Sequence, residues 1–206
     1  MSLFIVIEGC DGAGVGTQSE ILREKLMAKD NLLFLRYPDY NDPTGMMIND
    51  FLHEKVKLSK EILFCLYALN QLKDKGKIGG SLERGRVVLA DRYFTANLAY
   101  QCAHGFDLQK ALQFADIFEM PKPDLVIFLK VSSDVAIERK MKEKGSADVY
   151  ERDLELQRKV NEMYEKMIKE GVFAKEWVVV DGEKSIEEVS KEIERIVFSK
   201  LEESMD

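Results

Sequence analysis

Four glycines lie between an apolar run and a helical stretch near the start of the chain, a combination suited to phosphate binding. The apolar run covers residues 3–8, and the glycines follow within the next eight residues. Glycines let backbone N–H groups converge without obstruction by Cβ atoms, and a helix N-terminus adds partial positive charge. A tight turn without a ligand is the alternative interpretation. The residues expected to bind the phosphates of a nucleotide are Gly9, Gly12, Ala13, Gly14, Val15, Gly16 and Thr17.

This segment departs from the common phosphate-binding pattern G-x-x-x-x-G-K-[ST] at two positions. Val15 replaces the lysine, and Gly16 replaces serine or threonine, although Thr17 follows directly. A cation that stabilises the transferred phosphoryl group, such as an arginine finger, is worth about 10³–10⁵ in rate. The sequence therefore predicts nucleotide binding by backbone amides, with chemistry that is weakened unless another cation replaces the lysine.

A second candidate site follows the apolar run of residues 86–91, which ends in Asp91 and continues into Arg92. A carboxylate at the end of a parallel strand is placed to hold Mg²⁺ directly or through water. We therefore expect Asp91, with Thr17, to serve as a metal ligand, and Arg92 to face the same crevice. The alternatives are a helix N-cap for Asp91 and a surface ion pair for Arg92.

Alternating strands and helices must position these residues. Short apolar runs of the kind found in buried strands cover residues 3–8, 32–36, 86–91, 124–130 and 176–181. Helical patterns extend to about residue 29 and cover 60–74, two segments between 92 and 119, 132–142, 151–169 and a last stretch from about 185. Near-continuous hydrophobic strands separated by helices predict a parallel sheet covered on both faces, hence a three-layer α/β/α fold.

Composition restricts the class of protein. The 206 residues include 30 basic and 37 acidic side chains, a net charge of −7, which disfavours general binding to nucleic acid or anionic membranes. No apolar run approaches the roughly 18 residues of a membrane span. Three widely spaced cysteines disfavour a disulfide framework or a zinc site and favour the cytoplasm. We expect one domain over residues 1–206, with a lid at about 139–152; an ordinary surface loop is the alternative for the lid.

Several motifs resemble the thymidylate kinase family of P-loop proteins in both order and spacing, from about residue 3 to residue 197. They are EGCDGAGVGTQ, LRYPDY, LYALNQ, DRYFTANLAYQ, PKPDLVIFL, DVYERD and VVVDGEKSIEEV. The resemblance implies a five-stranded P-loop fold with a small lid. It also implies transfer of the γ-phosphoryl group of ATP to dTMP with Mg²⁺, as a step towards dTTP, by a homodimer.

The resemblance assigns catalytic roles to three residues. Asp11 would contact the sugar hydroxyl and position the acceptor phosphate, Arg92 would bind that phosphate, and Arg139 would lie over the nucleotide from the lid. Gly182 would lie near the adenine of ATP. A turn aspartate that bonds its own backbone is the alternative interpretation of Asp11.

The same resemblance implies a pocket for the acceptor nucleotide. Tyr37 would lie near the sugar or base, Tyr40 near the phosphate, and Tyr67 would stack on the base. Gln71 takes the place of an arginine that reads a base carbonyl, to which its amide could still donate. Packing aromatics are the alternative interpretation of these tyrosines.

Further pocket residues come from the motif DRYFTANLAYQ and from the lid. Asn97 and Gln101 would face the base, Tyr100 would crowd the 2′ position and exclude ribonucleotides, and Tyr150 belongs to the lid motif. A solvated helix face is the alternative for Asn97 and Gln101, and core packing is the alternative for Tyr100.

Three family cations are absent, at Val15, Gln71 and Val149. Lysines in the lid could supply part of the missing charge; they are Lys140, Lys142 and Lys144. Two alternatives to a thymidylate kinase therefore stay open: a deoxynucleoside monophosphate kinase with shifted base preference, and a weak or inactive nucleotide-binding homologue.

Overall fold

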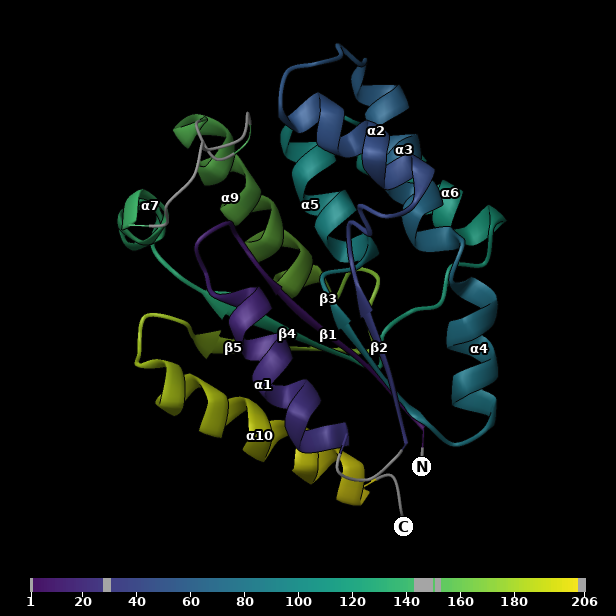
Figure 1. The fold of residues 1–206 in the computed structure, drawn as a ribbon, viewed down its shortest axis with the longest axis vertical. Coiled ribbons are helices and arrows are strands. Elements are labelled where there is room, and N and C mark those ends of the chain that lie inside the picture. Colours follow the sequence, from purple (N-terminus) through teal and green to yellow (C-terminus); the bar gives the residue numbers. More distant parts are fainter. Residues whose placement is uncertain (1, 28–30, 143–149, 151–152, 204–206) are drawn as a thin grey trace.

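A parallel sheet organises the molecule, which is seen in a computed structural model that describes residues 2–27, 31–142, 150 and 153–203 (Figure 1). The strands are β1 (Leu3–Gly9), β2 (Leu32–Arg36), β3 (Val87–Asp91), β4 (Leu125–Lys130) and β5 (Glu176–Asp181). Their order across the sheet is β2-β3-β1-β4-β5, and all neighbouring pairs are parallel. The predicted α/β class is confirmed, and each predicted strand matches the observed one to within a residue at either end.

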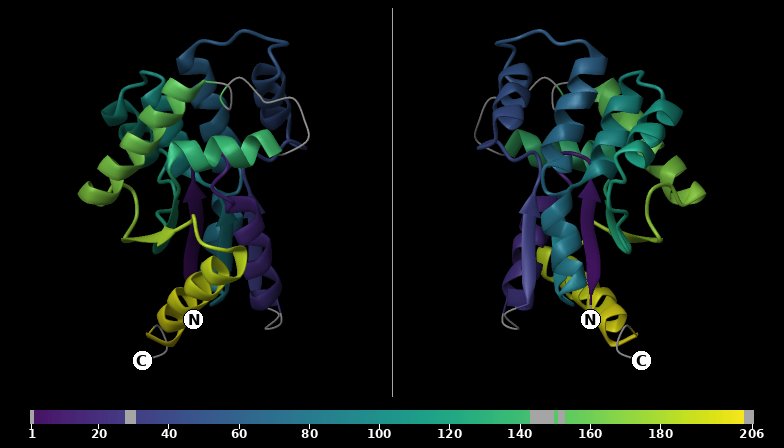
Figure 2. Two further views of the ribbon diagram at one scale, coloured as in Figure 1. Left: turned by 90° about the vertical axis from the view of Figure 1, so that its left-hand side faces the viewer. Right: turned by 90° about the vertical axis from the view of Figure 1, so that its right-hand side faces the viewer.

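Helices cover both faces of this sheet (Figure 2). One face carries α1 (Val15–Met27) and α10 (Ile186–Glu203), and α7 (Ser133–Lys142) lies near the same side. The other face carries α2 (Pro43–Leu52), α3 (Lys60–Leu72), α4 (Lys75–Glu83), α5 (Phe94–Ala103), α6 (Leu108–Ile117) and α9 (Leu154–Glu170). These layers are the predicted α/β/α sandwich.

The alternation of side chains along β1 explains the two cores. Phe4 and Val6 pack in the cluster under α5 and α9, whereas Ile5 and Ile7 pack against α1 and α10. Each of these side chains is fully buried, and burying one such side chain is worth about 1.5–3 kcal/mol. The central strand is therefore held between two apolar layers, and its carboxyl end is a rigid support for the residues that follow it.

The helices differ from the sequence prediction in two places. Helix α2 was not predicted; Asp42 caps it by accepting a 2.9 Å hydrogen bond from the backbone N–H of Thr44, and Pro43 lies in its first turn. The helix predicted over 60–74 ends at Leu72, and α4 starts separately at Lys75. The intervening residues are polar and compatible with helix, so the composition alone does not indicate the break.

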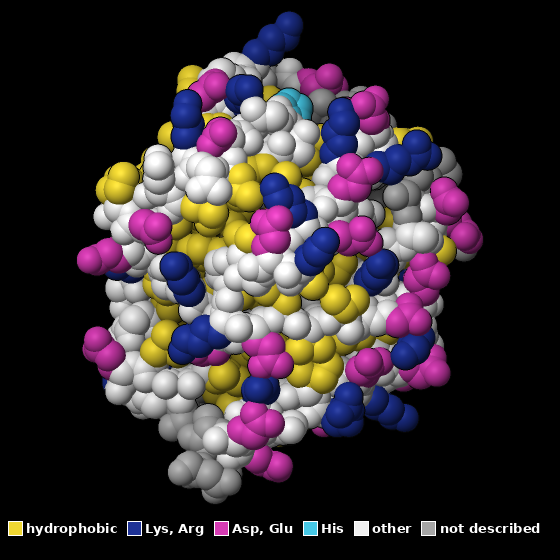
Figure 3. Space-filling model, turned by 180° about the vertical axis from the view of Figure 1, so that it is seen from behind, with side chains coloured by type: hydrophobic (Ala, Val, Ile, Leu, Met, Phe, Trp, Pro, Cys, Tyr) yellow, Lys and Arg dark blue, Asp and Glu magenta, His cyan; other side chains and the backbone are white. Residues whose placement is uncertain are grey.

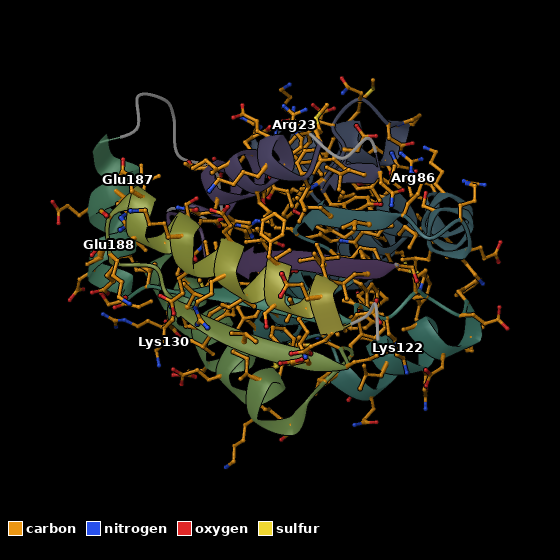
Figure 4. All side chains as sticks on the ribbon, turned by 90° about the horizontal axis from the view of Figure 1, so that it is seen from below. Arg23, Arg86, Lys122, Lys130, Glu187 and Glu188 are labelled. Atoms are coloured by element: carbon orange, nitrogen blue, oxygen red, sulfur yellow. The ribbon has the colours of Figure 1, made fainter. Side chains whose placement is uncertain are left out.

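The start of α10 agrees with its sequence signature. Ser185 Oγ accepts from the backbone N–H of Glu188, and Glu188 Oε2 accepts from the backbone N–H of Ser185. Glu187 and Glu188 lie at the N-terminal end of this helix, where negative charge is favourable (Figure 4).

Candidate active site

The candidate site lies at the carboxyl edge of the sheet, where β1 and β3 end side by side. Ile7 pairs with Asp91 in the β1–β3 register, so the glycine-rich loop after Gly9 emerges beside Arg92. Ligands of open α/β sheets bind outside the carboxyl ends of their strands. The two candidate sites inferred from the sequence therefore lie next to each other.

The glycine-rich loop has a conformation that requires glycine. Gly12 and Gly14 have φ of +84° and +87°, in the left-handed region. A Cβ on Gly12 would lie 2.5 Å from the backbone oxygen of Ala136, so a side chain cannot be added there without displacing α7. The loop leads directly into α1, whose N-terminus is suited to bind an anion.

A cavity of about 290 Å³ lies beside this loop. Its lining brings together residues from the loop, α7 and the turn after β5, which are far apart in the sequence. The guanidinium of Arg139 approaches the backbone oxygen of Gly12 at 3.5 Å. The lining residues are Gly12, Ala13, Gly14, Thr17, Gln18, Arg139, Gly182, Lys184, Ile186 and Val189.

Val15 does not contribute a polar group to this cavity. Its side chain is 4% exposed and packs in the apolar cluster between the sheet and α10. A Cβ added to Gly9 would lie 3.0 Å from Val15 Cγ2, so the valine lies directly under the loop. Among the described residues that line the cavity, the cations are Arg139 and Lys184.

Asp91 lies between the N-terminal end of α1 and the guanidinium of Arg36. Its Oδ2 accepts a 2.7 Å hydrogen bond from Arg36 Nε, and a Cβ on Gly16 would lie 3.7 Å from the same oxygen. Partial burial acts to lower the pKa of Arg36, but the hydrogen bonds and ion pairs with Asp91 and Glu20 outweigh it and raise that pKa. Asp91 is therefore a hydrogen-bond acceptor for Arg36 at the start of α1.

The surroundings of Asp91 fit Mg²⁺ better than a metal held by protein alone. Within the described residues, no group of three or more His, Cys, Asp or Glu side chains could hold a metal ion. Mg²⁺ keeps several waters and is commonly bound by one or two carboxylates together with substrate phosphates. One carboxylate next to a glycine-rich loop at a helix N-terminus matches that pattern.

A second cavity, of about 260 Å³, lies on the other side of the loop. The structure brings together in its lining every residue that the sequence analysis assigned to substrate binding. These residues are Asp11, Tyr37, Tyr40, Tyr67, Gln71, Arg92, Asn97, Tyr100, Gln101 and Tyr150. They come from α3, α5, the segments that follow β1, β2 and β3, and the segment before α9, so only the fold makes them neighbours.

Arg92 lies at the centre of this cavity. Its guanidinium donates to Asp11 Oδ1 at 2.6 Å and to the hydroxyl of Tyr100 at 3.2 Å, and it lies over the Tyr100 ring at 5.4 Å. Burial acts to lower the pKa of Arg92, but Tyr100 and Asp11 hold it well above the usual value. The site therefore contains a guanidinium that is held in place beside the glycine-rich loop by its ion pair with Asp11.

Three carboxamide residues line the cavity, and the oxygen of each is a buried atom. Gln71 Nε2 donates to the backbone oxygen of Tyr93 at 3.1 Å, and Asn97 Nδ2 donates to that of Phe64 at 3.3 Å. Gln71 Oε1, Asn97 Oδ1 and Gln101 Oε1 are buried and have no partner among the described residues. The sequence analysis expects Gln71 to donate to a base carbonyl; in the structure one of the two N–H groups of Nε2 donates to Tyr93, and Oε1 has no partner among the described residues.

The aromatic residues differ in how they contribute. Tyr37 is buried and donates its hydroxyl to Asp74 Oδ2 at 3.0 Å, so its ring rather than its hydroxyl lines the cavity. Tyr40 is 46% exposed at the rim. Tyr150 is buried, with its ring centroid 5.9 Å from that of Phe51 and 5.8 Å from that of Tyr100.

Gln157 is a site residue that the sequence analysis did not identify. Its Nε2 donates to Asp11 Oδ2 at 3.1 Å and to the backbone oxygen of Tyr150 at 3.0 Å. The amide therefore links α9 to the glycine-rich loop and to the end of the candidate lid. The sequence holds one indication of this role: Gln157 lies on the face of α9 that also buries Val160 and Tyr164, where a polar residue is unusual.

Most of the candidate lid lies outside the described residues. These undescribed positions are 143–149 and 151–152, so the expectations for Lys144 and Val149 fall there, and the side chains of Lys140 and Lys142 are not described. Arg139 and Tyr150, on either side, do line the two cavities.

Comparison with known proteins identifies the family of this chain. The family model described as "Thymidylate kinase" matches residues 7–193. The chain belongs to the thymidylate kinase family. The thymidylate kinase of Dictyostelium discoideum is 32% identical over 97% of this chain and 86% of its own length. The putative thymidylate kinase 251L of Invertebrate iridescent virus 6 is 31% identical over 95% of this chain and 87% of its own length.

A solved thymidylate kinase has the same fold. The structure of the thymidylate kinase from Candida albicans, an enzyme described as having broad substrate specificity and a novel structural element, superposes with a TM-score of 0.76. It is 26% identical and covers 97% of this chain and 92% of its own. In this thymidylate kinase family member, no described helix is long and apolar enough to cross a membrane.

Proposed function

We propose that this chain transfers the γ-phosphoryl group of ATP to dTMP, giving ADP and dTDP. The observation that carries the proposal is the pair of cavities on either side of the glycine-rich loop. Successive residues of that loop, Asp11 and Gly12, line the two cavities. Two bound nucleotides would therefore meet with their phosphates at this loop.

The cavity beside α1 is the proposed ATP site. The backbone N–H groups of the glycine-rich loop and the N-terminus of α1 would hold the phosphates, and Gly182 would lie near the adenine. Arg139 and Lys184 are the described cations there. Asp91, with Thr17, would hold Mg²⁺, and bound Mg²⁺ supplies positive charge to the phosphate oxygens.

The cavity lined by α3 and α5 is the proposed dTMP site. Arg92 would bind the acceptor phosphate through its planar guanidinium, and Asp11 would orient the sugar. Tyr67 offers a face on which the base could stack, and Tyr100 limits space at the 2′ position. Phosphoryl transfer depends mainly on positioning and charge stabilisation, and both would come from groups that are already in place.

Two further properties are part of the proposal. The exposed apolar residues Ile62 and Leu69, two turns apart on one face of α3, and Ile117 on α6 support a homodimer, because exposed apolar patches mark protein–protein interaction sites. The rear face also exposes hydrophobic side chains among charged ones of both signs (Figure 3). The free thiols of Cys10, Cys65 and Cys102 support a reducing compartment, the cytoplasm. Light scattering after size-exclusion chromatography tests the dimer.

A coupled assay of ADP release, run with ATP, Mg²⁺ and a panel of nucleoside monophosphates, tests the activity. We expect dTMP to raise ADP release well above the rate without acceptor, and ribonucleotides to do so much less. If no acceptor raises the rate while ADP binds in a calorimetric titration, the kinase proposal is wrong and the chain is a nucleotide-binding homologue.

A further inference from the structure

Glu8 is a fully buried carboxylate that the proposed function does not use. It is the residue before Gly9 at the end of β1, directly beneath the glycine-rich loop. A buried charge is costly unless it is well paired, so its contacts show what it stabilises.

The carboxylate of Glu8 accepts four hydrogen bonds from two helical elements. Oε1 accepts from the backbone N–H of Tyr93 at 3.0 Å, the backbone N–H of Ala96 at 3.1 Å and the hydroxyl of Thr95 at 2.5 Å. Oε2 accepts from the hydroxyl of Tyr164 at 2.8 Å. One side chain of β1 therefore binds the start of α5 and the middle of α9.

At α5, Glu8 acts as an N-cap that comes from another element. The residue at the N-cap position, Tyr93, makes no side-chain capping bond of its own. The first N–H groups of a helix need acceptors from outside the helix, and a negative charge is favourable there. Glu8 supplies such an acceptor, so the start of α5 is fixed relative to β1.

The same contacts fix the backbone of Arg92. Arg92 has φ of +63°, an unfavourable value for a residue with a side chain, which persists only where the surroundings enforce it. The N–H of Arg92 donates to the backbone oxygen of Ile7 at 3.0 Å, and the next N–H, of Tyr93, donates to Glu8. Two successive residues of β1 thus hold two successive N–H groups and direct the guanidinium towards Asp11.

We propose that Glu8 is a positioning residue for phosphoryl transfer, which holds Arg92 opposite the glycine-rich loop by capping α5 and anchoring α9. The proposal rests on the proposed function, because Arg92 is taken to bind the acceptor phosphate. Glu8 touches neither nucleotide cavity, so its effect on the reaction is carried by Arg92.

Two substitutions at Glu8 separate its hydrogen bonds from its charge. Glu8→Gln keeps an oxygen that can accept from Tyr93 and Ala96, whereas Glu8→Leu has similar volume and accepts nothing. A displacement of about 1 Å in a catalytic group can cost about 10² in rate. We expect Glu8→Leu to lower kcat about 10²-fold with KM for ATP changed by less than about threefold, and Glu8→Gln to recover most of kcat.

Two tyrosine variants provide a matched comparison that changes the core less. Tyr164→Phe removes the hydroxyl that donates to Glu8 Oε2, and we expect kcat to fall severalfold. Tyr93→Phe removes a buried hydroxyl that has no hydrogen-bond partner among the described residues, and we expect kcat to be unchanged. If Glu8→Leu does not fold, the two tyrosine variants test the proposal by themselves. Equal kcat values in Tyr164→Phe and Tyr93→Phe overturn it.

Hydrogen exchange of the backbone amides gives a readout that does not need activity. The N–H groups of Tyr93 and Ala96 should be protected in the wild type and in Glu8→Gln, and should exchange faster in Glu8→Leu. Wild-type kcat in a folded Glu8→Leu, or unchanged protection at Tyr93 and Ala96, overturns the positioning role. A wild type that binds nucleotides without phosphorylating dTMP overturns the proposed function instead, and the exchange measurement still tests the cap.

Discussion

At the scale of single residues, the placement of positive charge around the two cavities governs what the site can do. The family lysine is replaced by Val15, whose side chain lies in the apolar core, and the described cations are Arg139 and Lys184 on one side and Arg36 and Arg92 on the other. Arg92 is the more buried of the two arginines on that side, with a side chain 20% exposed against 50% for Arg36, and Asp11 and Tyr100 both accept from its guanidinium.

Arg92→Met tests the acceptor-phosphate role. We expect kcat/KM for dTMP to fall at least about 10³-fold, since an arginine on a transferred or accepting phosphate is worth about 10³–10⁵. The coupled ADP assay measures the change. Arg195→Met, at an exposed position of α10, is the matched control, and its kcat/KM for dTMP should equal that of the wild type. A loss of less than tenfold in Arg92→Met would rule out this role.

Gln157→Leu tests the link between α9 and the loop. The variant loses both donors to Asp11 and Tyr150, so we expect kcat to fall about tenfold while the melting temperature changes little. In an Asp11→Asn background, the same substitution should have almost no further effect, because Gln157 is expected to act through Asp11. Gln109→Leu, at an exposed position of α6, is the control, and fully additive losses would contradict the link.

Val15→Lys tests whether the missing lysine can simply be restored. The side chain at this position points into an apolar cluster, so a lysine must either be buried or displace the loop. We expect a free energy of unfolding lower by about 1–3 kcal/mol, measured by urea denaturation, and no gain in kcat. Faster turnover at unchanged stability would show that the cavity admits an ammonium group from this position.

At the scale of elements, the success of sequence reasoning depends on how local the determining interactions are. The strands were predicted to within a residue because both faces of the sheet are covered, which makes each strand a continuous apolar run. Helix α2 was missed because its sequence contains Pro43 and Gly45, and it depends on the cap from Asp42. The break between α3 and α4, after Leu72, could not be predicted because the residues there are of types also found within helices.

The same reasoning applies to the site. The residues lining the acceptor cavity were found because short motifs in order resemble a known family. Glu8 and Gln157 were not found, because Glu8 meets residues 85 to 156 positions away and Gln157 meets Asp11, 146 positions away. A polar residue inside a buried strand or on a buried helical face is a signal, but it does not say which distant group it meets.

The capping box of α10 gives a prediction at this scale. Ser185→Ala removes the oxygen that accepts from the N–H of Glu188, and we expect the free energy of unfolding to fall by about 1 kcal/mol. Chemical denaturation measures it. Ser199→Ala, at an exposed position near the end of the same helix, should change stability by much less. Equal effects at both positions would mean that the cap contributes nothing.

At the scale of the whole molecule, Glu8 should make stability depend on pH. Burial raises the pKa of Glu8 from 4.5 to about 7, although bonds from Thr95 and Tyr164 and the charge of Arg92 oppose the shift. A carboxyl group with a raised pKa contributes stability below its unfolded pKa, and this contribution is lost as pH rises through the folded pKa. At about 1.4 kcal/mol per pKa unit, the loss between pH 4.5 and 8 is on the order of 3 kcal/mol.

Denaturant titrations of the wild type and Glu8→Gln across this pH range measure that contribution. The amide does not titrate, so the stability of Glu8→Gln relative to the wild type should rise between pH 5 and pH 8. Parallel pH profiles in the two proteins would show that Glu8 does not titrate in this range.

The ion pair between Arg92 and Asp11 has a consequence for the whole reaction. In the structure the guanidinium is already neutralised by a carboxylate at 2.6 Å, so an entering ligand must exchange with that carboxylate. If the chain has the proposed function, a phosphate dianion can replace Asp11 as the partner of Arg92 and leave Asp11 to face the sugar. An uncharged nucleoside has no anionic group that could replace Asp11. The ion pair would thus favour binding of nucleotides over binding of the corresponding nucleosides, which lack the phosphate.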